Sequence, residues 1–163
     1  MTVAVRAATP GDIGDLAGIE EISFNTDRIS RRQFRYLLRR ARATTLVATD
    51  DDGPPLGYAT VLYRRGSPLA RLYSIAVRPD RRGEGIAAVL VGAAEAAALA
   101  RGATRMRLEV RADDSGTQQF YLREGYRRLG MRPNYYEDDG DAVRMEKQLT
   151  LSPDLGLAAR APR

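Results

Sequence analysis

The chain has 163 residues, of which 26 are basic and 21 acidic, and its net charge is +5. This length predicts one domain with a sizeable core. The absence of cysteine and histidine excludes a cysteine nucleophile, a Ser-His-Asp triad and a zinc site of the usual ligands. We therefore expect no metal, and a general base that is a carboxylate, a tyrosine, the single lysine Lys147, a chain terminus or water.

Hydropathy and charge patterning bear on location and partners. No apolar run approaches the roughly 18 residues that span a bilayer, and the first residues lack the pattern of an export signal. We therefore expect a cytoplasmic protein without a membrane partner. The arginines are dispersed among acidic residues, so we expect no basic tail, no sustained basic helix face and no nucleic-acid partner.

The amino-terminal half is predicted to form one strand, two helices and three further strands. Residues 2–7 alternate weakly in the manner of a strand. A turn then leads into a helix whose apolar face is predicted to carry Ile13, Leu16, Ile19 and Ile22. Ser30 is the predicted N-cap of the second helix. The three strands that follow are predicted at 44–49, 56–64 and 69–77.

The carboxy-terminal half is predicted to alternate helices and strands. A helix rich in alanine and leucine is expected from 85 to 101, where Gly102 ends it. Residues 104–111 alternate clearly as a strand, and residues 113–115 can cap a short helix that continues through Glu124. The last two strands are predicted at 126–132 and 142–149. The order of these elements favours a single α/β domain over residues 1–150, with 151–163 as a flexible tail.

The segment between strand 69–77 and helix 85–101 is the most informative part of the chain. It contains Arg81-Arg82-Gly83-Glu84-Gly85-Ile86-Ala87. Small residues at this turn let the backbone approach a bulky polyanion closely, and the helix start points its N–H groups at the same place. The turn therefore favours a phosphate-bearing ligand, although a glycine-rich turn can also simply begin a helix.

Beyond this turn, several motifs together resemble the GNAT superfamily of N-acetyltransferases. Arg82-x-x-Gly85-x-Ala87 fits the signature of the superfamily, and Leu108-Glu109-Val110-Arg111 is similar to the strand that follows it. Phe120 to Tyr126 is similar to the element that carries the superfamily's tyrosine. The Asn134-Tyr135-Tyr136 loop resembles the branch of ribosomal-protein alanine N-acetyltransferases.

The resemblance implies a GNAT fold. This fold is a mixed, mostly antiparallel twisted sheet of about six to seven strands, with helices on both faces. It also implies that strands 69–77 and 104–111 splay apart. Acetyl-coenzyme A is the implied cosubstrate. Its implied binding residues are Ile75, Ala76, Val77, Arg82, Gly83, Glu84, Gly85, Ile86, Ala87, Asp114 and Tyr121.

Two residues are catalytic candidates by the same resemblance. Glu109 would accept a proton from the attacking amine through a water, or it would merely form an ion pair with a neighbouring arginine of its own strand, Arg105, Arg107 or Arg111. Tyr121 would lie beside the thioester sulfur and donate a proton to the leaving thiolate, or it would be a core aromatic. Asp114 stands where the superfamily often has asparagine; it can cap a helix but cannot donate a hydrogen bond when ionised.

The acceptor is expected between the loop near residue 135 and the second helix. Its predicted binding residues are Phe34, Tyr36, Tyr135 and Tyr136. The resemblance implies direct attack of a primary amine, and the expected acceptor is the N-terminus of a protein or peptide. A small-molecule acetyltransferase of the same fold and a non-catalytic module that binds coenzyme A remain the alternatives. A monomer and a homodimer are both compatible with the sequence.

Overall fold

The computed structural model describes residues 3–149, so the segment 151–163 lies outside the described residues. The helices are α1 (Ile13–Ser23), α2 (Arg31–Arg39), α3 (Ile86–Ala100) and α4 (Ser115–Arg123), with short 3-10 turns η1 (Pro10–Asp12) and η2 (Pro79–Arg81). The strands are β1 (Val3–Ala7), β2 (Ala43–Asp50), β3 (Gly57–Tyr63), β4 (Leu69–Val77), β5 (Arg105–Arg111), β6 (Arg127–Arg132) and β7 (Ala142–Gln148). The sequence predicts the four α-helices and the seven strands, and wherever it gives both ends of an element these differ by at most two residues.

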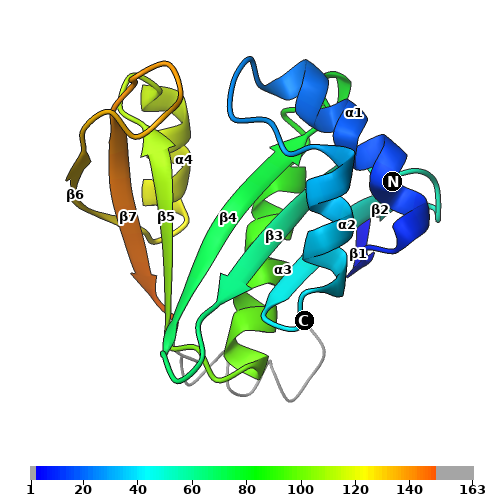
Figure 1. Ribbon diagram of the computed structural model, residues 1–163, viewed down its shortest axis with the longest axis horizontal. Coiled ribbons are helices and arrows are strands. Elements are labelled where there is room, and N and C mark those ends of the chain that lie inside the picture. Colours follow the sequence, from blue (N-terminus) through cyan, green and yellow to red (C-terminus); the bar gives the residue numbers. More distant parts are fainter. Residues whose placement is uncertain (1–2, 150–163) are drawn as a thin grey trace.

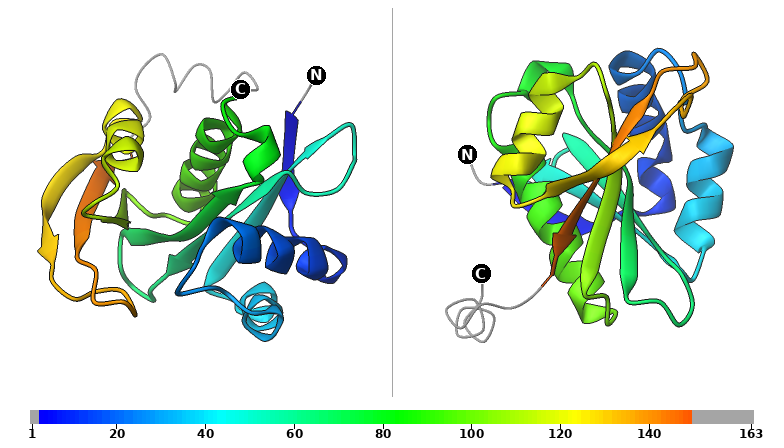
Figure 2. Two further views of the ribbon diagram at one scale, coloured as in Figure 1. Left: turned by 90° about the horizontal axis from the view of Figure 1, so that it is seen from above. Right: turned by 90° about the vertical axis from the view of Figure 1, so that its left-hand side faces the viewer.

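The seven strands form one mixed sheet. Their spatial order is β1-β2-β3-β4-β5-β7-β6, and every neighbouring pair is antiparallel except β4 and β5. Figure 1 shows α1 and α2 in front of the sheet and α3 behind it, and the view from above in Figure 2 places α3 and α4 on the same side. This arrangement confirms the predicted fold.

The parallel pair of β4 and β5 is short. Only three residue pairs join the two strands, from Leu69 opposite Arg105 to Arg71 opposite Arg107. Beyond Arg71 the strands diverge, as Figure 1 shows, and this confirms the predicted splay. The remainder of β4 therefore has β3 along one edge and no strand along the other.

Two hydrophobic clusters lie on opposite faces of the sheet. The larger one joins α3 and α4 to the sheet, and the smaller one joins α1 and α2 to the other face. The alternation in β5 explains its orientation, because Met106, Leu108 and Val110 are buried in the larger cluster. Glu109 therefore points to the opposite face, towards the side of α1 and α2.

Helix α1 departs from the predicted apolar face at its last turn. Ile22 is 64% exposed, whereas Glu20 is only 2% exposed. Ile22 follows Ile13 by nine residues. At about 100° per residue, this separation places the two side chains on opposite sides of the helix. Glu20 takes the buried position and accepts hydrogen bonds from the backbone N–H of Ile29 (2.9 Å) and the hydroxyl of Tyr58.

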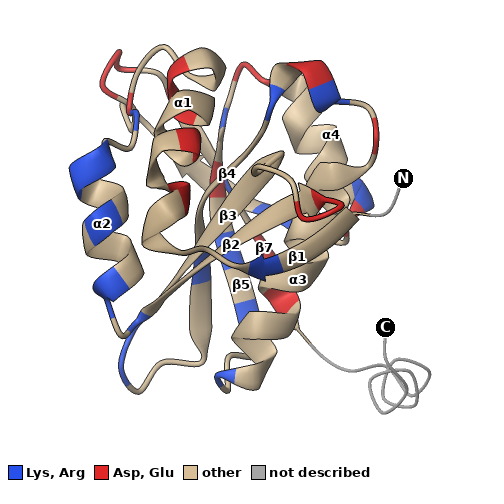
Figure 3. Ribbon diagram, turned by 90° about the vertical axis from the view of Figure 1, so that its right-hand side faces the viewer, with Lys and Arg blue, Asp and Glu red and all other residues tan. Residues whose placement is uncertain are grey.

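Helix α2 corrects the expectation that the chain has no basic helix face. Ser30 caps the helix as predicted, because its hydroxyl accepts a hydrogen bond from the backbone N–H of Gln33 (3.1 Å). The sequence of the helix, RRQFRYLLR, contains no acidic residue. All four of its arginines are exposed, and Figure 3 shows the helix as a series of blue bands. The dispersed arginines of the sequence thus gather on one surface when the helix forms.

Within residues 3–149, none of the helices is both long enough and apolar enough to cross a membrane.

We predict that Glu20→Gln makes stability less dependent on pH. Burial raises the pKa of Glu20 above its ordinary value of 4.5, so the folded protein binds this proton more tightly than the unfolded chain does. Its contribution to stability therefore falls as pH rises from that value through the raised pKa. Urea denaturation at several pH values between 4 and 8 should show a smaller decline for Glu20→Gln than for the parent protein.

The matched control for this prediction is the exposed neighbour Glu21→Gln. This variant should follow the parent protein at every pH, because an exposed carboxylate has nearly the same environment in both states. Parallel curves for Glu20→Gln and the parent would contradict the assigned role of burial.

Candidate active site

The turn between β4 and α3 adopts a conformation that favours glycine. Gly83 and Gly85 both have a φ of 80°, in the left-handed region that other residues seldom adopt. A Cβ atom added at either position would meet no atom within 4 Å. The two glycines therefore leave an open space directly in front of the first turn of α3.

The backbone N–H groups of this turn are available to a ligand. Among the described residues, no backbone N–H from Arg82 to Ala88 donates a hydrogen bond. Arg82 forms no ion pair with a described carboxylate; its side chain donates to the backbone oxygen of Val77 (3.2 Å) and to the hydroxyl of Ser23 (3.4 Å). Free N–H groups, a helix N-terminus and an adjacent guanidinium are the features that bind phosphate groups in proteins.

The open edge of β4 continues this space towards the centre of the sheet. Ile75, Ala76 and Val77 pair with β3 on one side only. Nearer the start of β4 the register with β3 shifts by one residue: Thr60 lies opposite Ser74, whereas Val61 lies opposite Leu72. The intervening Tyr73 forms a bulge, and bulges of this kind commonly redirect a side chain next to a functional site.

Glu109 of β5 is buried and held by arginines of both flanking strands. Its Oε1 atom lies 2.8 Å from Nη2 of Arg71 and accepts a hydrogen bond from Nε of the same residue at 3.0 Å. Its Oε2 atom accepts from Nε of Arg144 at 3.0 Å. Glu109 therefore does form ion pairs, but not with the arginines of its own strand that the sequence suggested. Cross-strand neighbours lie closer to it than residues two positions away on β5.

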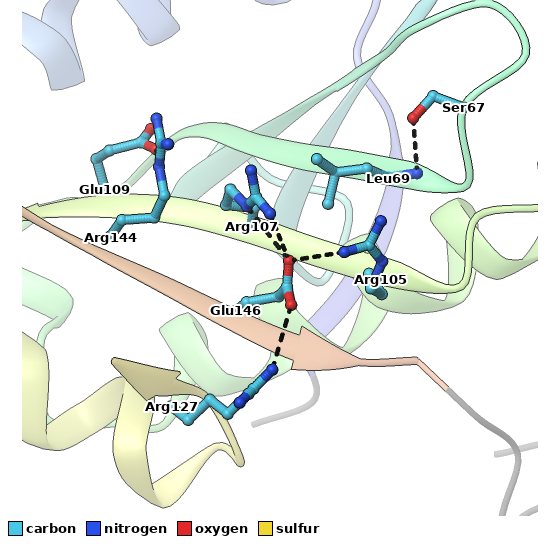
Figure 4. Close-up of polar contacts among 8 residues, drawn as sticks. All are labelled: Ser67, Leu69, Arg105, Arg107, Glu109, Arg127, Arg144 and Glu146. Carbon is cyan, nitrogen blue, oxygen red and sulfur yellow. Dashed lines mark hydrogen bonds and ion pairs between the residues drawn. The ribbon is translucent and has the colours of Figure 1, made fainter. Parts of the chain in front are cut away.

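A second buried carboxylate lies on the same face of the sheet. Glu146 of β7 contacts Arg107 at 2.9 Å, Arg105 at 3.4 Å and Arg127 at 3.7 Å. Figure 4 shows these arginines converging on Glu146, with Glu109 and Arg144 beside them. The face opposite α3 and α4 therefore carries two buried carboxylates surrounded by a larger number of guanidinium groups.

The loop before β7 brings the predicted acceptor residue Tyr135 to Glu109, with Tyr136 beside it. The hydroxyl of Tyr135 donates to Oε1 of Glu109 at 3.3 Å and also accepts a hydrogen bond from Arg71. Burial raises the pKa of Tyr135. Tyr136 packs edge-on against Tyr135 at 5.0 Å, and burial raises its pKa to about 12. Both phenols are therefore protonated near neutral pH.

Tyr121 of α4 has a buried ring and a hydroxyl that forms no hydrogen bond with the described residues. Its side chain packs edge-on against Phe120 and Tyr126, at 5.0 and 5.4 Å between ring centroids. Burial raises the pKa of Tyr121, so this phenol is protonated near neutral pH. By contrast, the neighbouring Tyr126 donates a hydrogen bond to Glu95 (2.8 Å), which also pairs with Lys147 at 3.0 Å.

Asp114 is the N-cap of α4, as the sequence predicts. Its carboxylate accepts hydrogen bonds from the backbone N–H of Thr117 (3.0 Å) and from the hydroxyl of the same residue (2.7 Å). Glu84, another predicted binding residue, pairs through its side chain with Arg81 at 2.9 Å. Only the backbone of Glu84 therefore faces the open space of the turn.

The structure does not place Phe34 on the surface where an acceptor would bind. Phe34 is completely buried and packs edge-on against Tyr58, at 5.3 Å between ring centroids, because it lies on the sheet side of α2. Tyr36, two residues further, is exposed. It lines a cavity of about 240 Å³ together with Arg40 and the bulged Tyr73. Of the two residues predicted on this helix, only Tyr36 is accessible.

Sequence reasoning misses Arg71, Tyr73 and Arg144. Arg144 lies in the strand predicted at 142–149, but its contact with Glu109 depends on β7 lying beside β5, which the sequence does not predict. The bulge at Tyr73 leaves no mark in the sequence pattern. Among the described residues, no three acidic side chains are grouped in a way that could hold a metal ion.

Comparisons with known proteins agree with this geometry. The model of the Acetyltransferase (GNAT) family matches residues 15–126, which is more than half of the chain. A Bacillus subtilis protein whose name proposes it as a ribosomal protein bS18-alanine N-acetyltransferase is 30% identical over 138 residues, which cover 85% of this chain and 89% of that protein.

Solved structures share the fold. The structure of Ard1 from Thermoplasma volcanium superposes with a TM-score of 0.84 and 25% identity, covering 92% of this chain and 99% of that one. The matching chain of a NatC complex bound to Gag peptide and CoA gives a TM-score of 0.79 with 21% identity, over 92% of this chain and 100% of that one. The chain therefore belongs to the GNAT family and is an acetyltransferase.

Proposed function

We propose that the protein transfers an acetyl group from acetyl-coenzyme A to the primary amine of a protein or peptide N-terminus. One observation carries this proposal: the open edge of β4 connects the glycine turn before α3 with the buried carboxylate of Glu109. The similarity to the Bacillus subtilis protein supports the choice of acceptor.

The residues of the turn fit a diphosphate. The backbone N–H groups from Arg82 to Ala87 have no other partner among the described residues, and the space in front of Gly83 and Gly85 is open. Arg82 adds a positive charge beside them. The backbone of Ile75 to Val77 would hold the extended pantetheine arm along the open edge of β4. When bound there, the donor supplies the acetyl thioester.

The acceptor amine would lose its proton beside Glu109. Oε2 of Glu109 accepts one hydrogen bond from the described residues, so it retains a lone pair for a water that removes the proton. The guanidinium groups of Arg71 and Arg144 lie against this carboxylate and disfavour an ammonium ion. An α-amino group, whose ordinary pKa is about 8, loses its proton more easily than a lysine side chain.

The neutral amine then attacks the carbonyl carbon of the thioester. The new C–N bond replaces the C–S bond, and the sulfur leaves as a thiolate that needs a proton. The protonated hydroxyl of Tyr121 has no competing hydrogen bond within the described residues, so it is the proposed proton donor. The amine thus loses one proton beside Glu109 before it attacks and a second proton when the amide forms, and this second proton balances the one that Tyr121 gives to the sulfur.

We predict that Gly85→Ala weakens the binding of coenzyme A. An alanine here must adopt a φ of 80°, and its Cβ projects into the space proposed for the diphosphate. The loss should be about tenfold or more in the dissociation constant, measured by calorimetry, which corresponds to at least about 1.4 kcal/mol. Gly92→Ala in the middle of α3 is the matched control, because its Cβ meets no atom within 4 Å and its backbone is helical. Equal affinities for the two variants would exclude the turn as the diphosphate site.

We also predict that Tyr121→Phe lowers kcat by about a hundredfold, as expected when a general acid is removed. The affinity for coenzyme A and the melting temperature should change little, because the hydroxyl forms no hydrogen bond with the described residues. The control Tyr126→Phe removes a hydrogen bond to Glu95, so it should lower stability by about 1 kcal/mol while kcat is retained. Full activity of Tyr121→Phe with every accepted amine would refute the proton-donor role.

The proposed activity itself is tested by mass spectrometry of peptides and small amines incubated with labelled acetyl-coenzyme A. Label on peptide α-amines supports the proposal. Label on small amines alone would favour a small-molecule acetyltransferase. Coenzyme binding without transfer to any acceptor would indicate a binding module without turnover.

A further inference from the structure

Arginines outnumber the carboxylates that they contact around Glu109 and Glu146. Arg71 and Arg144 contact Glu109, and three other arginines contact Glu146. Five guanidinium groups thus face two carboxylates. Each carboxylate is almost completely buried, with 5 and 6% of its side chain exposed, so solvent screens it little.

Arg144 is placed to bind a further anion. It uses Nε for Glu109, and neither of its Nη atoms donates a hydrogen bond to a described residue. Its side chain is 27% exposed, so the free edge of the guanidinium is accessible. Arg71 directs Nε and Nη2 to Glu109, and its Nη1 is likewise without a partner among the described residues. A planar guanidinium whose two Nη groups form one free edge matches the geometry of a carboxylate.

An acceptor without an acidic group near its amine would fit this site poorly. The reacting amine arrives mostly as a cation near neutral pH. Next to Glu109 it would add a positive charge to a cluster in which arginines already outnumber carboxylates. An acceptor that carries its own carboxylate close to the amine would offset this charge and fill the free donors of Arg144.

We infer that the acceptor carries a carboxylate within a few bonds of the reacting amine, and that Arg144, assisted by Arg71, binds it. This inference rests on the proposed function and narrows its substrate class. The carboxylate has two sources with the same chemistry: an acidic side chain near the N-terminus of a peptide, or the α-carboxylate of a free amino acid. Because the peptide N-terminus is the proposed acceptor, the acidic peptide is the expected source.

The test compares pairs of acceptors in which an amide replaces this carboxylate. The peptide pair is Ala-Asp-Ala-Ala-amide and Ala-Asn-Ala-Ala-amide, and the small-molecule pair is alanine and alaninamide. In the wild-type protein at fixed acetyl-coenzyme A, kcat/KM should be at least about tenfold higher for the acidic peptide, the effect of one charge-assisted hydrogen-bond pair. A preference for alanine over alaninamide without any preference between the peptides would identify a free amino acid as the source of the carboxylate.

Variants assign the preference to its residue. Arg144→Gln should lower the acid-to-amide ratio to about one, mainly through KM, and Arg144→Lys should retain part of it, because lysine keeps the charge but not the planar pair of donors. The matched control is Arg64→Gln, an exposed arginine in the turn before β4, which should keep the ratio of the parent. A ratio unchanged in Arg144→Gln would overturn the assignment.

A second measurement separates this inference from the proposed function. Calorimetric titration of the two peptides into the protein saturated with coenzyme A reports acceptor binding without turnover. Tighter binding of the acidic peptide with no acetyl transfer would sustain the carboxylate site and reject the proposed activity. Efficient transfer with equal rates and affinities for both members of each pair would reject the carboxylate site and leave the proposed activity intact.

Discussion

Strands β4 and β5 are held together by three residue pairs, and the site depends on the divergence that follows. β5 can leave β4 because all seven of its residues pair with β7 on the other side. Its backbone groups are therefore satisfied along that edge, and its apolar side chains are buried against α3 and α4. The interruption of the sheet leaves backbone groups of β4 without a strand partner. The free edge of β4 lies where a donor with an extended arm can pair with it.

The electrostatics of the site follow from the same arrangement. A carboxylate at Glu109 points to the face opposite the larger core and is buried by the strands around it. Burying a charge is costly unless it is paired, and the flanking strands supply one arginine each. These arginines hold the carboxylate in a fixed orientation. They also add positive charge next to the proposed base, so the residues that stabilise this carboxylate would also influence which acceptors can approach it.

Sequence patterns predict much of this structure, and the exceptions have physical causes. The alternation in β5, the caps at Ser30 and Asp114 and the glycines at 83 and 85 are local signals, and the structure confirms the elements they predict. The partners of Glu109 depend on the order of strands in the sheet, which no local pattern encodes. The predicted burial of Ile22 is wrong because a repeated spacing of three residues gradually moves around the helix. Phe34 is not accessible to an acceptor because a helix that borders a site must also bury one of its sides against the sheet.

The basic character of this protein is almost entirely arginine, since Lys147 is the single lysine of the chain. That ammonium group pairs with Glu95 at 3.0 Å and has 29% of its side chain exposed. Thioesters acylate lysine amines but leave guanidinium groups intact under ordinary conditions. Lys147 is therefore the one side-chain amine of this sequence that an activated acyl donor could acylate. The protein's surface charge, and any electrostatic choice among acceptors, would persist through prolonged exposure to the reagent it handles.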